Sequence, residues 1–301
     1  SRIPMYIAIT QNVVNIIASL GLVYLCGMKV EGVALGTLIA QYAGFLMGIV
    51  LWMHNYGRLK RFWEIKNYKL KIKGREGAGI WEKEAMFRFF QVNRDIFLRT
   101  LCLVAVTLFF TSAGASQGEI ILAVNTLLMQ LFTLFSYVMD GFAYAGEALS
   151  GRYIGARNRE AFTDTVRHLF GWGAVMAVLF TLVYALGGNA FLGLLTDDKE
   201  VIAVADTYFY WALAVPAVGI AAFIWDGIFI GATATRGMLL SMAAAAVSFF
   251  ILYYGLHPVL ANHALWLAFL TYLLMRGVVQ TGLSREVIRR AFPSKKEPAW
   301  R

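Results

Sequence analysis

Residues 118–157 read GEIILAVNTLLMQLFTLFSYVMDGFAYAGEALSGRYIGAR, and this stretch decides the fold. It is apolar over the length of a membrane-spanning helix, yet it carries Asn125, Asp140 and Glu147 and ends in basic residues. Ionisable side chains inside a bilayer are costly, and they commonly mark a path for ions or substrate. The stretch therefore predicts a helix of a membrane transporter.

The composition of the whole chain indicates the same class. Hydrophobic residues make up 59% of the 301 residues, charged residues 15%, and the mean hydropathy is +0.62. Such a chain has more apolar surface than one globular core can bury. We expect an all-α integral membrane protein with about eight transmembrane helices, because the apolar runs do not alternate as barrel strands do. The predicted spans are 4–26, 32–53, 94–113, 118–146, 166–187, 201–231, 237–255 and 263–283.

Positive charge predicts the orientation of these spans. Lysine and arginine gather in 54–94, 147–167, 231–237 and 284–301, whereas the loops on the other side hold few. Cytoplasmic loops carry an excess of these residues. We therefore expect a multi-pass protein of the plasma membrane, in bacteria the inner membrane, with both ends of this chain in the cytoplasm.

The same charges divide the chain into parts. The basic segment 56–93 is predicted to be a cytoplasmic linker that touches anionic lipid between two lobes. It separates residues 1–55, expected to form the last two helices of a first lobe, from a complete six-helix second lobe at 94–285. A basic cytoplasmic tail is expected at 286–301.

An internal similarity bears on the first lobe. The sequences SRIPM at 1–5 and TRGM at 235–238 each precede two apolar spans. Repeated halves are a common plan in secondary transporters. We therefore expect this chain to be truncated at its N-terminus, with about four helices of a first lobe missing.

Three segments resemble a known family. Residues 125–157 are similar to the eighth helix of multidrug and toxic compound extrusion (MATE) transporters. Residues 93–100, NRDIFLRT, resemble the seventh helix of one subgroup, and residues 225–231, WDGIFIG, resemble its tenth. The resemblance covers essentially the whole chain, which would correspond to helices 5–12 of a twelve-helix, two-lobe fold.

The resemblance implies a secondary antiporter that exports organic cations or drugs in exchange for protons or sodium. One coupling site of the family uses an acidic residue on the first helix, which this chain does not contain. Other members place an acidic pair on the seventh and tenth helices, and Asp226 falls at the tenth-helix position. Asp95 is predicted near the cytoplasmic end of its span, so the seventh-helix role is not carried over to it.

The position of Asp226 supports a functional role on physical grounds. It precedes Arg236 by ten residues, so it is expected roughly 15 Å deeper along the helix, well inside the hydrocarbon. A carboxylate there is a candidate for exchanging a proton or attracting a cation. The alternative is a structural hydrogen bond to a neighbouring helix, and a salt bridge or exposure to lipid would count against the coupling role.

Asp140 and Glu147 are further candidates for cation coupling or substrate binding. They are seven residues apart, so two helical turns place them on about the same face. Asp140 and Asp226 are each followed by glycine at a similar depth, which fits either a shared polar pocket or a packing contact. Glu147 lies near the cytoplasmic end, where pairing with a nearby arginine, Arg152 or Arg99, is the alternative.

The uncharged polar residues of the spans give weaker candidates for a substrate pocket. Hydrogen bonds to neighbouring helices are the alternative for most of them. The candidates are Asn125, Gln130, Tyr144 and Tyr210, together with Arg99.

Other functional classes lack their motifs. The four histidines show no zinc-ligand spacing, and no glycine-rich phosphate loop is present. We therefore expect no enzyme, no metal site, no cofactor beyond the coupling proton or sodium ion, no nucleic-acid partner and no obligate protein partner. The expected partners are small organic cations or drugs and the lipid bilayer.

Two alternative functions stay open. A lipid-linked oligosaccharide flippase of the same superfamily would share the helix plan, but it would need a more cationic cavity than Arg99 and Arg276 within the spans indicate. A membrane-embedded enzyme would need convergent His, Cys or Ser side chains. Organic cations are favoured as substrates because the excess of charge within the spans is predicted to be acidic.

Overall fold

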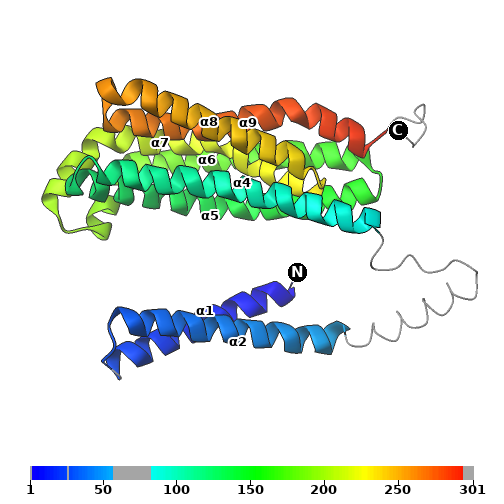
Figure 1. Cartoon of the computed structure of the whole chain (residues 1–301), viewed down its shortest axis with the longest axis horizontal. Helices are drawn as coiled ribbons and strands as arrows, with labels where there is room; N and C mark the ends of the chain where they lie inside the picture. Colours follow the sequence, from blue (N-terminus) through cyan, green and yellow to red (C-terminus); the bar gives the residue numbers. More distant parts are fainter. Residues whose placement is uncertain (1, 26, 57–82, 294–301) are drawn as a thin grey trace, which may run out of the picture. The chain divides into compact units, whose positions relative to one another are not determined.

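The computed structural model describes residues 2–25, 27–56 and 83–293, and this part of the chain is built of helices (Figure 1). It contains eight helices that are long and apolar enough to cross a membrane, which confirms the predicted all-α, multi-pass membrane class. The chain divides into two compact units, Ser1–Lys83 and Glu84–Arg301.

The first unit is a hairpin of two helices, α1 (Arg2–Tyr24) and α2 (Val30–Tyr56). The helices approach closely where Gly36 meets Ser19, since a Cβ atom added at Gly36 would lie 2.8 Å from the Ser19 backbone. Most other side chains of the hairpin are exposed within this unit. A small residue at the crossing therefore lets the two helices pack backbone to backbone.

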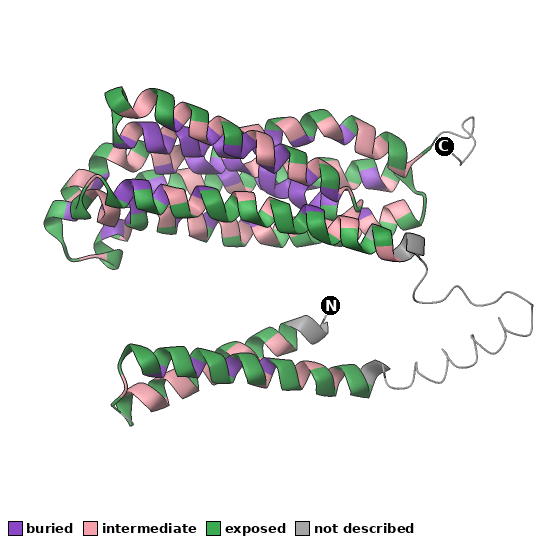
Figure 2. Cartoon of the chain, viewed as in Figure 1, coloured by how far each residue is buried: buried purple, intermediate pink, exposed green. Residues whose placement is uncertain are grey.

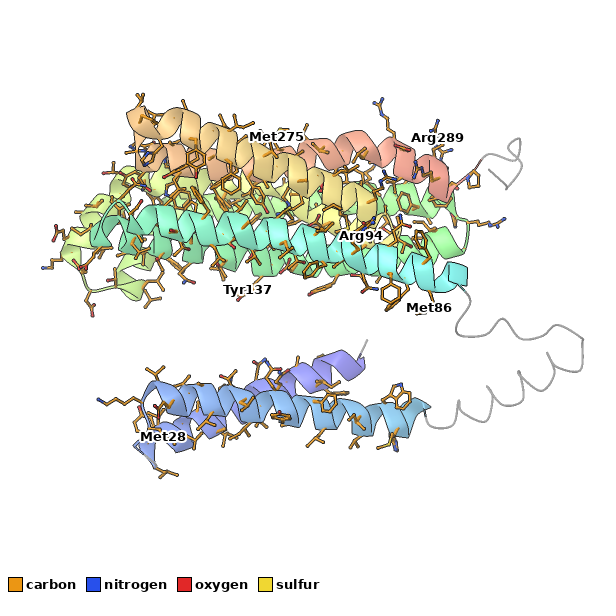
Figure 3. All side chains as sticks on the ribbon, in the orientation of Figure 1. Met28, Met86, Arg94, Tyr137, Met275 and Arg289 are labelled. Carbon is orange, nitrogen blue, oxygen red and sulfur yellow. The ribbon has the colours of Figure 1, made fainter. Side chains whose placement is uncertain are left out.

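The second unit is an elongated bundle of six helices that run roughly along one direction, up and down (Figure 1). The buried residues are concentrated on α7 and α9, which pack against each other in the interior (Figure 2). Apolar and aromatic side chains project from the outer faces, for example Tyr137 (Figure 3), as a lipid environment favours. The helices are α4 (Lys83–Ala115), α5 (Glu119–Gly155), α6 (Arg159–Leu195), α7 (Lys199–Gly231), α8 (Thr235–Leu260) and α9 (Asn262–Ala291).

Helices α5 and α7 make the closest approach in the bundle. Gly227 of α7 faces the backbone of Ala143, and an added Cβ atom would overlap the Ala143 carbonyl oxygen. One turn later, Gly231 faces the carbonyl oxygen of Glu147 in the same way. The two glycines therefore fix the crossing of α5 and α7 next to Asp226.

Helix α4 is attached differently. It contacts the other helices mainly through long side chains rather than by close approach of its backbone. Phe109 packs edge to face on aromatic rings of α8, and Phe110 packs on Trp266 and Phe269 of α9. The position of α4 therefore depends on a small number of side-chain contacts.

The helices extend beyond the predicted apolar spans. Helix α4 begins at Lys83, well before the predicted start at residue 94, and α5 and α6 continue through most of the predicted loop 147–167. The loop prediction is wrong in extent because hydropathy marks only the part of a helix inside hydrocarbon, while polar turns at its ends stay helical in the interface. Most of the predicted linker and the end of the predicted tail lie outside the described residues, and the domain boundaries stay predictions.

Candidate functional site

A buried carboxylate joins three helices of the bundle. Asp226 of α7 is only 8% exposed, and its side chain accepts hydrogen bonds from α4 and α9. Its Oδ2 atom accepts from Arg99 of α4 and, at 2.6 Å, from Nη2 of Arg276 of α9. Its Oδ1 atom accepts from Nε2 of Gln280 at 2.5 Å. We refer to Arg99, Asp226, Arg276 and Gln280 as the Asp226 cluster.

The α9 members of the cluster share one helix face. Arg276 and Gln280 are four residues apart, so both side chains reach Asp226 from the same side. The guanidinium of Arg276 also lies over the rings of Phe223 and Tyr272, at 5.9 and 5.6 Å from their centroids. Aromatic faces attract such a cation, so packing and charge fix Arg276 together.

The cluster keeps unused hydrogen-bonding capacity. Among the described residues, Nε of Arg99, Nε of Arg276 and Oε1 of Gln280 are buried without a hydrogen-bond partner. Buried polar groups are normally paired, because an unpaired group loses its hydration without compensation. The Asp226 cluster therefore offers two N–H donors and one acceptor to a polar ligand group or to water.

Asp140 lies beside the cluster without joining its hydrogen bonds. It is partly buried on α5 and is close enough to Asp226 and Arg276 for direct electrostatic interaction. With Arg99 included, two carboxylates therefore face two guanidiniums. The acidic excess expected from the sequence is wrong for this region, because both arginines of the spans converge on it.

Glu147 is partly buried on α5, at the point where Gly231 of α7 approaches the α5 backbone. Within the described part of the chain it forms neither of its predicted ion pairs. Arg99 pairs with Asp226 instead, and the guanidinium of Arg152 lies 5.9 Å from the ring centroid of its neighbour Tyr153. The Glu147 carboxylate is thus separate from the ion pairs that hold Asp226.

A second buried polar group is neutral. Asn125 of α5 and Asn262 of α9 exchange amide hydrogen bonds of 2.8 and 3.0 Å. The indole Nε1 of Trp266 donates to Oδ1 of Asn125 at 2.8 Å. All three residues are buried, and we refer to them as the asparagine clasp. The clasp holds α5 against α9, and Asn125 is its α5 member.

The other uncharged candidates lie on the surface of the bundle. Gln130 and Tyr144 are exposed on α5, and neither contributes to the Asp226 cluster. Tyr210 is half exposed, and its hydroxyl group hydrogen-bonds Nδ1 of His263 at 3.0 Å. These positions do not converge on one pocket.

Asp95 is buried at a different place from Asp226. Its carboxylate pairs with Arg94 at 3.1 Å and accepts a 3.4 Å hydrogen bond from Thr235 at the start of α8. This arrangement ties the early part of α4 to α8. It gives Asp95 a structural contact apart from the Asp226 cluster.

Sequence reasoning did not assign Arg276 or Gln280 to the site. Their signal was present, since two polar side chains four residues apart in an apolar span share one helix face. What the sequence did not reveal is which helix that face contacts. In the described part of the chain, no group of three His, Cys, Asp or Glu side chains could hold a metal ion.

Comparisons with known proteins agree with this architecture. A family model described as MatE matches residues 96–259. DNA damage-inducible protein F of Escherichia coli (strain K12) is 37% identical over 281 residues, which cover 92% of this chain and 58% of that protein. Protein DETOXIFICATION 42 of Arabidopsis thaliana is 20% identical over 92% of this chain and 50% of its own length.

A solved structure shares the fold. A crystal structure of MATE in the bent conformation superposes with a TM-score of 0.75 at 16% sequence identity, over 95% of this chain and 62% of that one. The chain thus spans between half and two thirds of the length of these relatives.

Proposed function

Because this chain belongs to the MatE family, whose members are transporters and not enzymes, we propose that it is part of a secondary antiporter that exports organic cations or drugs. In this proposal it supplies helices 5–12 of a twelve-helix, two-lobe protein, and the second unit is the complete second lobe. The E. coli relative favours the bacterial inner membrane, and the basic segments 54–94, 147–167, 231–237 and 284–301 favour a cytoplasmic position for both ends of the chain.

The observation that carries the coupling part of the proposal is the charged junction of α4, α7 and α9 at Asp226, whereas the substrate class rests on the family match. One carboxylate holds two guanidiniums there, so the negative charge of Asp226 keeps three helices together. Neutralising that charge would weaken both ion pairs at once. Helix α4 is held to the bundle mainly by side chains, among them Phe109, Phe110 and Asp95, so we propose that it is the helix whose position responds most.

The contacts of Asp226 favour a proton as the coupling ion. Both carboxylate oxygens accept hydrogen bonds from N–H groups. A hard metal cation prefers a shell of several oxygen ligands, which these donors do not provide. A proton needs no such shell and removes the charge directly. Sodium would instead require several oxygen ligands in place of the N–H donors of Arg99, Arg276 and Gln280.

The ion pairs also restrict when coupling can occur. A salt bridge was the observation that would count against a freely available coupling carboxylate, and Asp226 has two. We therefore propose that Asp226 is protonated only in a conformation in which α4 has moved Arg99 away. Asp140, which is near Arg276 but not hydrogen-bonded to it, is proposed as the carboxylate that compensates Arg276 at that stage. Glu147 is proposed as an acid on the cytoplasmic side of the path.

A second candidate function rests on the two arginines. Their free Nε–H groups are donors of the kind that bind carboxylate or phosphate groups. An exporter of anionic compounds, including a flippase of lipid-linked anions, would bind its substrate through Arg99 and Arg276. Asp226 would then compete with the substrate for these two arginines. The charge of the transported compound separates this candidate from the first.

The test is efflux driven by a pH gradient from vesicles that contain the full-length protein. A fluorescent organic cation and an anionic dye of similar size are compared. We expect export of the cation, and we expect Asp226→Asn to abolish it. Asp206→Asn serves as the matched control, because Asp206 is an exposed acid on the same helix. Export of the anion alone would support the second candidate, and unimpaired export by Asp226→Asn would refute the coupling role.

A further inference from the structure

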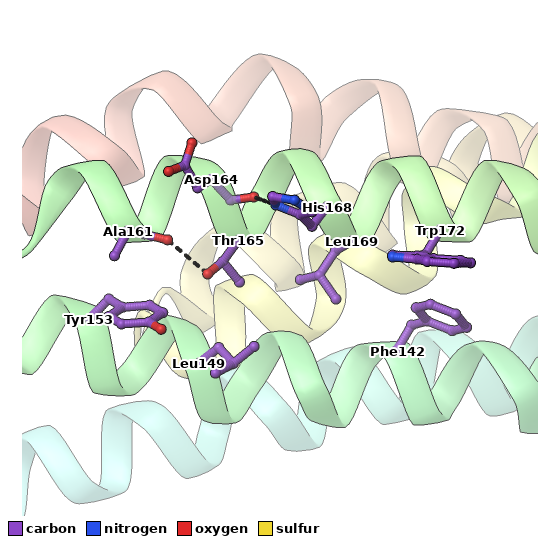
Figure 4. Close-up of a pocket in the computed structure, with 9 residues that line it drawn as sticks. All are labelled: Phe142, Leu149, Tyr153, Ala161, Asp164, Thr165, His168, Leu169 and Trp172. Atoms are coloured by element: carbon purple, nitrogen blue, oxygen red, sulfur yellow. Dashed lines mark hydrogen bonds between the residues drawn. The ribbon is translucent and has the colours of Figure 1, made fainter.

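An elongated pocket of about 440 Å³ lies between α5 and α6 and ends near the turn that joins them (Figure 4). We refer to it as the α5–α6 groove. Its lining residues extend from Phe142 to Tyr153 on α5 and from Ala161 to Trp172 on α6. At 1.5 Å per residue, each wall is roughly 16 Å long. The groove therefore has the length of an extended chain rather than of a single ring system.

The groove crosses the expected edge of the hydrocarbon layer. Phe142 and Trp172 fall inside the apolar spans predicted at 118–146 and 166–187, whereas Tyr153 lies between these spans. One end of the groove is therefore expected in hydrocarbon and the other at the level of the lipid headgroups. A site that extends through both layers suits a molecule with an apolar chain and a polar head.

The walls at the hydrocarbon end are apolar and aromatic. Phe142 of α5 and Trp172 of α6 face each other across the groove, and Leu149 and Leu169 line it beside them (Figure 4). The Trp172 side chain is 62% exposed, so its ring is available to a molecule in the membrane. Such walls fit an acyl chain, which gains dispersion contacts along its whole length.

The polar side chains of α6 do not interrupt this wall. The hydroxyl of Thr165 donates to the Ala161 carbonyl oxygen at 2.8 Å. Nδ1 of His168 lies 2.7 Å from the Asp164 carbonyl oxygen, which only accepts, so Nδ1 is the donor. The Asp164 carboxylate points away from α5 (Figure 4). Both donors are thus turned onto the backbone of their own helix, and the wall does not require a polar ligand.

The end of the groove near the turn is positively charged. The guanidinium of Arg152 lies 5.9 Å from the ring centroid of Tyr153, which lines the groove. Arginine pairs with phosphate through parallel N–H donors. Basic residues at headgroup level also attract anionic lipid by about 1 kcal/mol each. The other exposed charged residues of the turn and of the first turns of α6 are Arg157, Arg159, Glu160 and Asp164, so that together with Arg152 the net charge is positive.

We propose that the α5–α6 groove binds one anionic phospholipid of the surrounding membrane. One acyl chain lies in the groove between Phe142 and Trp172, and the phosphate accepts hydrogen bonds from the guanidinium of Arg152. A choline headgroup would place a cation beside the same arginine, which offsets the attraction of its phosphate. None of the lining residues belongs to the Asp226 cluster, so the site does not depend on the proposed direction of transport.

Phosphatidylglycerol with bromine atoms in the middle of one acyl chain is a suitable probe, because bromine quenches the fluorescence of an indole ring that it contacts. The full-length protein is placed in nanodiscs of phosphatidylcholine that contain a small, increasing fraction of this lipid. Brominated phosphatidylcholine is the matched comparison. We expect phosphatidylglycerol to quench at an about tenfold lower fraction. Trp172→Phe keeps the aromatic wall and should remove the part of the quenching that is selective for phosphatidylglycerol.

Two substitutions test the charge and the space separately. Arg152→Gln should weaken phosphatidylglycerol binding by about tenfold, with Arg236→Gln as the control, because Arg236 is an exposed arginine at the start of α8. Ala161→Trp fills the groove at its headgroup end and should abolish the selective quenching. Its control is Ala174→Trp, at an exposed alanine of α6 outside the groove. The controls should change binding by about twofold or less. Elution as a single species from a sizing column shows that each variant is folded.

Four outcomes would overturn the proposal. Equal quenching by the two brominated lipids would show that the groove makes only the general contact of a bilayer surface. Selective quenching that persists in Trp172→Phe would place the lipid elsewhere. An equal loss of binding in Arg152→Gln and Arg236→Gln, or no loss in either, would show that Arg152 does not select the headgroup. Displacement of the phosphatidylglycerol by an equal amount of palmitate would make a free fatty acid the occupant.

Discussion

The Asp226 cluster and the asparagine clasp are two buried polar groups in one bundle, and both tie α9 to other helices. The clasp is neutral, and its amides and the indole N–H are matched to one another. The cluster is charged, holds two arginines on one carboxylate and retains unpaired polar atoms. A matched neutral group has one stable arrangement, whereas a charged group with spare donors and acceptors can be rearranged by a proton or a ligand.

The two groups also differ in the helices that they connect. The clasp joins α5 to α9 within the well-buried interior. The cluster includes Arg99 of α4, the helix held mainly by side chains. We therefore interpret the clasp as a fixed point of the bundle and the cluster as the group that changes partners. The following predictions test that contrast.

The largest expected effect is that of Asp226→Leu. It removes the hydrogen-bonded counter-charge of the buried Arg276 guanidinium and of the partly buried Arg99 guanidinium, and breaking a buried ion pair in this way typically costs about 3–5 kcal/mol of stability. Transport should be lost as well. Thermal unfolding in detergent, followed by circular dichroism, measures the first effect, and vesicle efflux measures the second. A variant that melts like the wild type would show that the ion pairs contribute little to stability.

A triple substitution separates stability from coupling. Adding Arg99→Met and Arg276→Met to Asp226→Leu replaces the ion pairs by apolar side chains, which is often neutral or stabilising by about 1–4 kcal/mol. We expect the triple variant to recover most of the lost thermal stability but to remain inactive in efflux. Recovery of transport together with stability would show that the cluster is structural only.

Asn125→Leu tests the clasp. It leaves the Asn262 amide and the Trp266 N–H without their acceptor, which costs about 1–3 kcal/mol. Because the clasp is interpreted as a fixed point, efflux per folded molecule should stay close to the wild-type rate. The measurement is efflux normalised to the amount of protein that elutes as a single species. A folded but inactive variant would place Asn125 on the transport path, in line with its place among the weaker sequence candidates for a substrate pocket.

The contrast between the two groups was only partly predictable from the sequence. Hydropathy and charge located the helices, and the depth of Asp226 and the presence of Arg99 in a span were readable from spacing. The pairing of Asp226 with Arg276 was not, because periodicity assigns a residue to a face of its own helix but does not say which helix that face contacts. For the same reason the sequence could not rank Asn125 above Gln130 and Tyr144 as a candidate, although of these three only Asn125 is buried in the structure.

The smallest expected effect is that of Tyr210→Phe, at the exposed rim where α7 meets the start of α9. The substitution removes one hydrogen bond to Nδ1 of His263, but Nε1 of Trp211 still donates to the same nitrogen at 3.1 Å. Since Tyr210 is half exposed, water replaces the lost contact, and the stability should change by about 0.5 kcal/mol or less. Efflux should also be unchanged, because neither buried group is touched. A clear fall in efflux by this folded variant would instead extend the transport path from the Asp226 cluster to the rim, and the contrast between the two buried groups would then describe only its inner part.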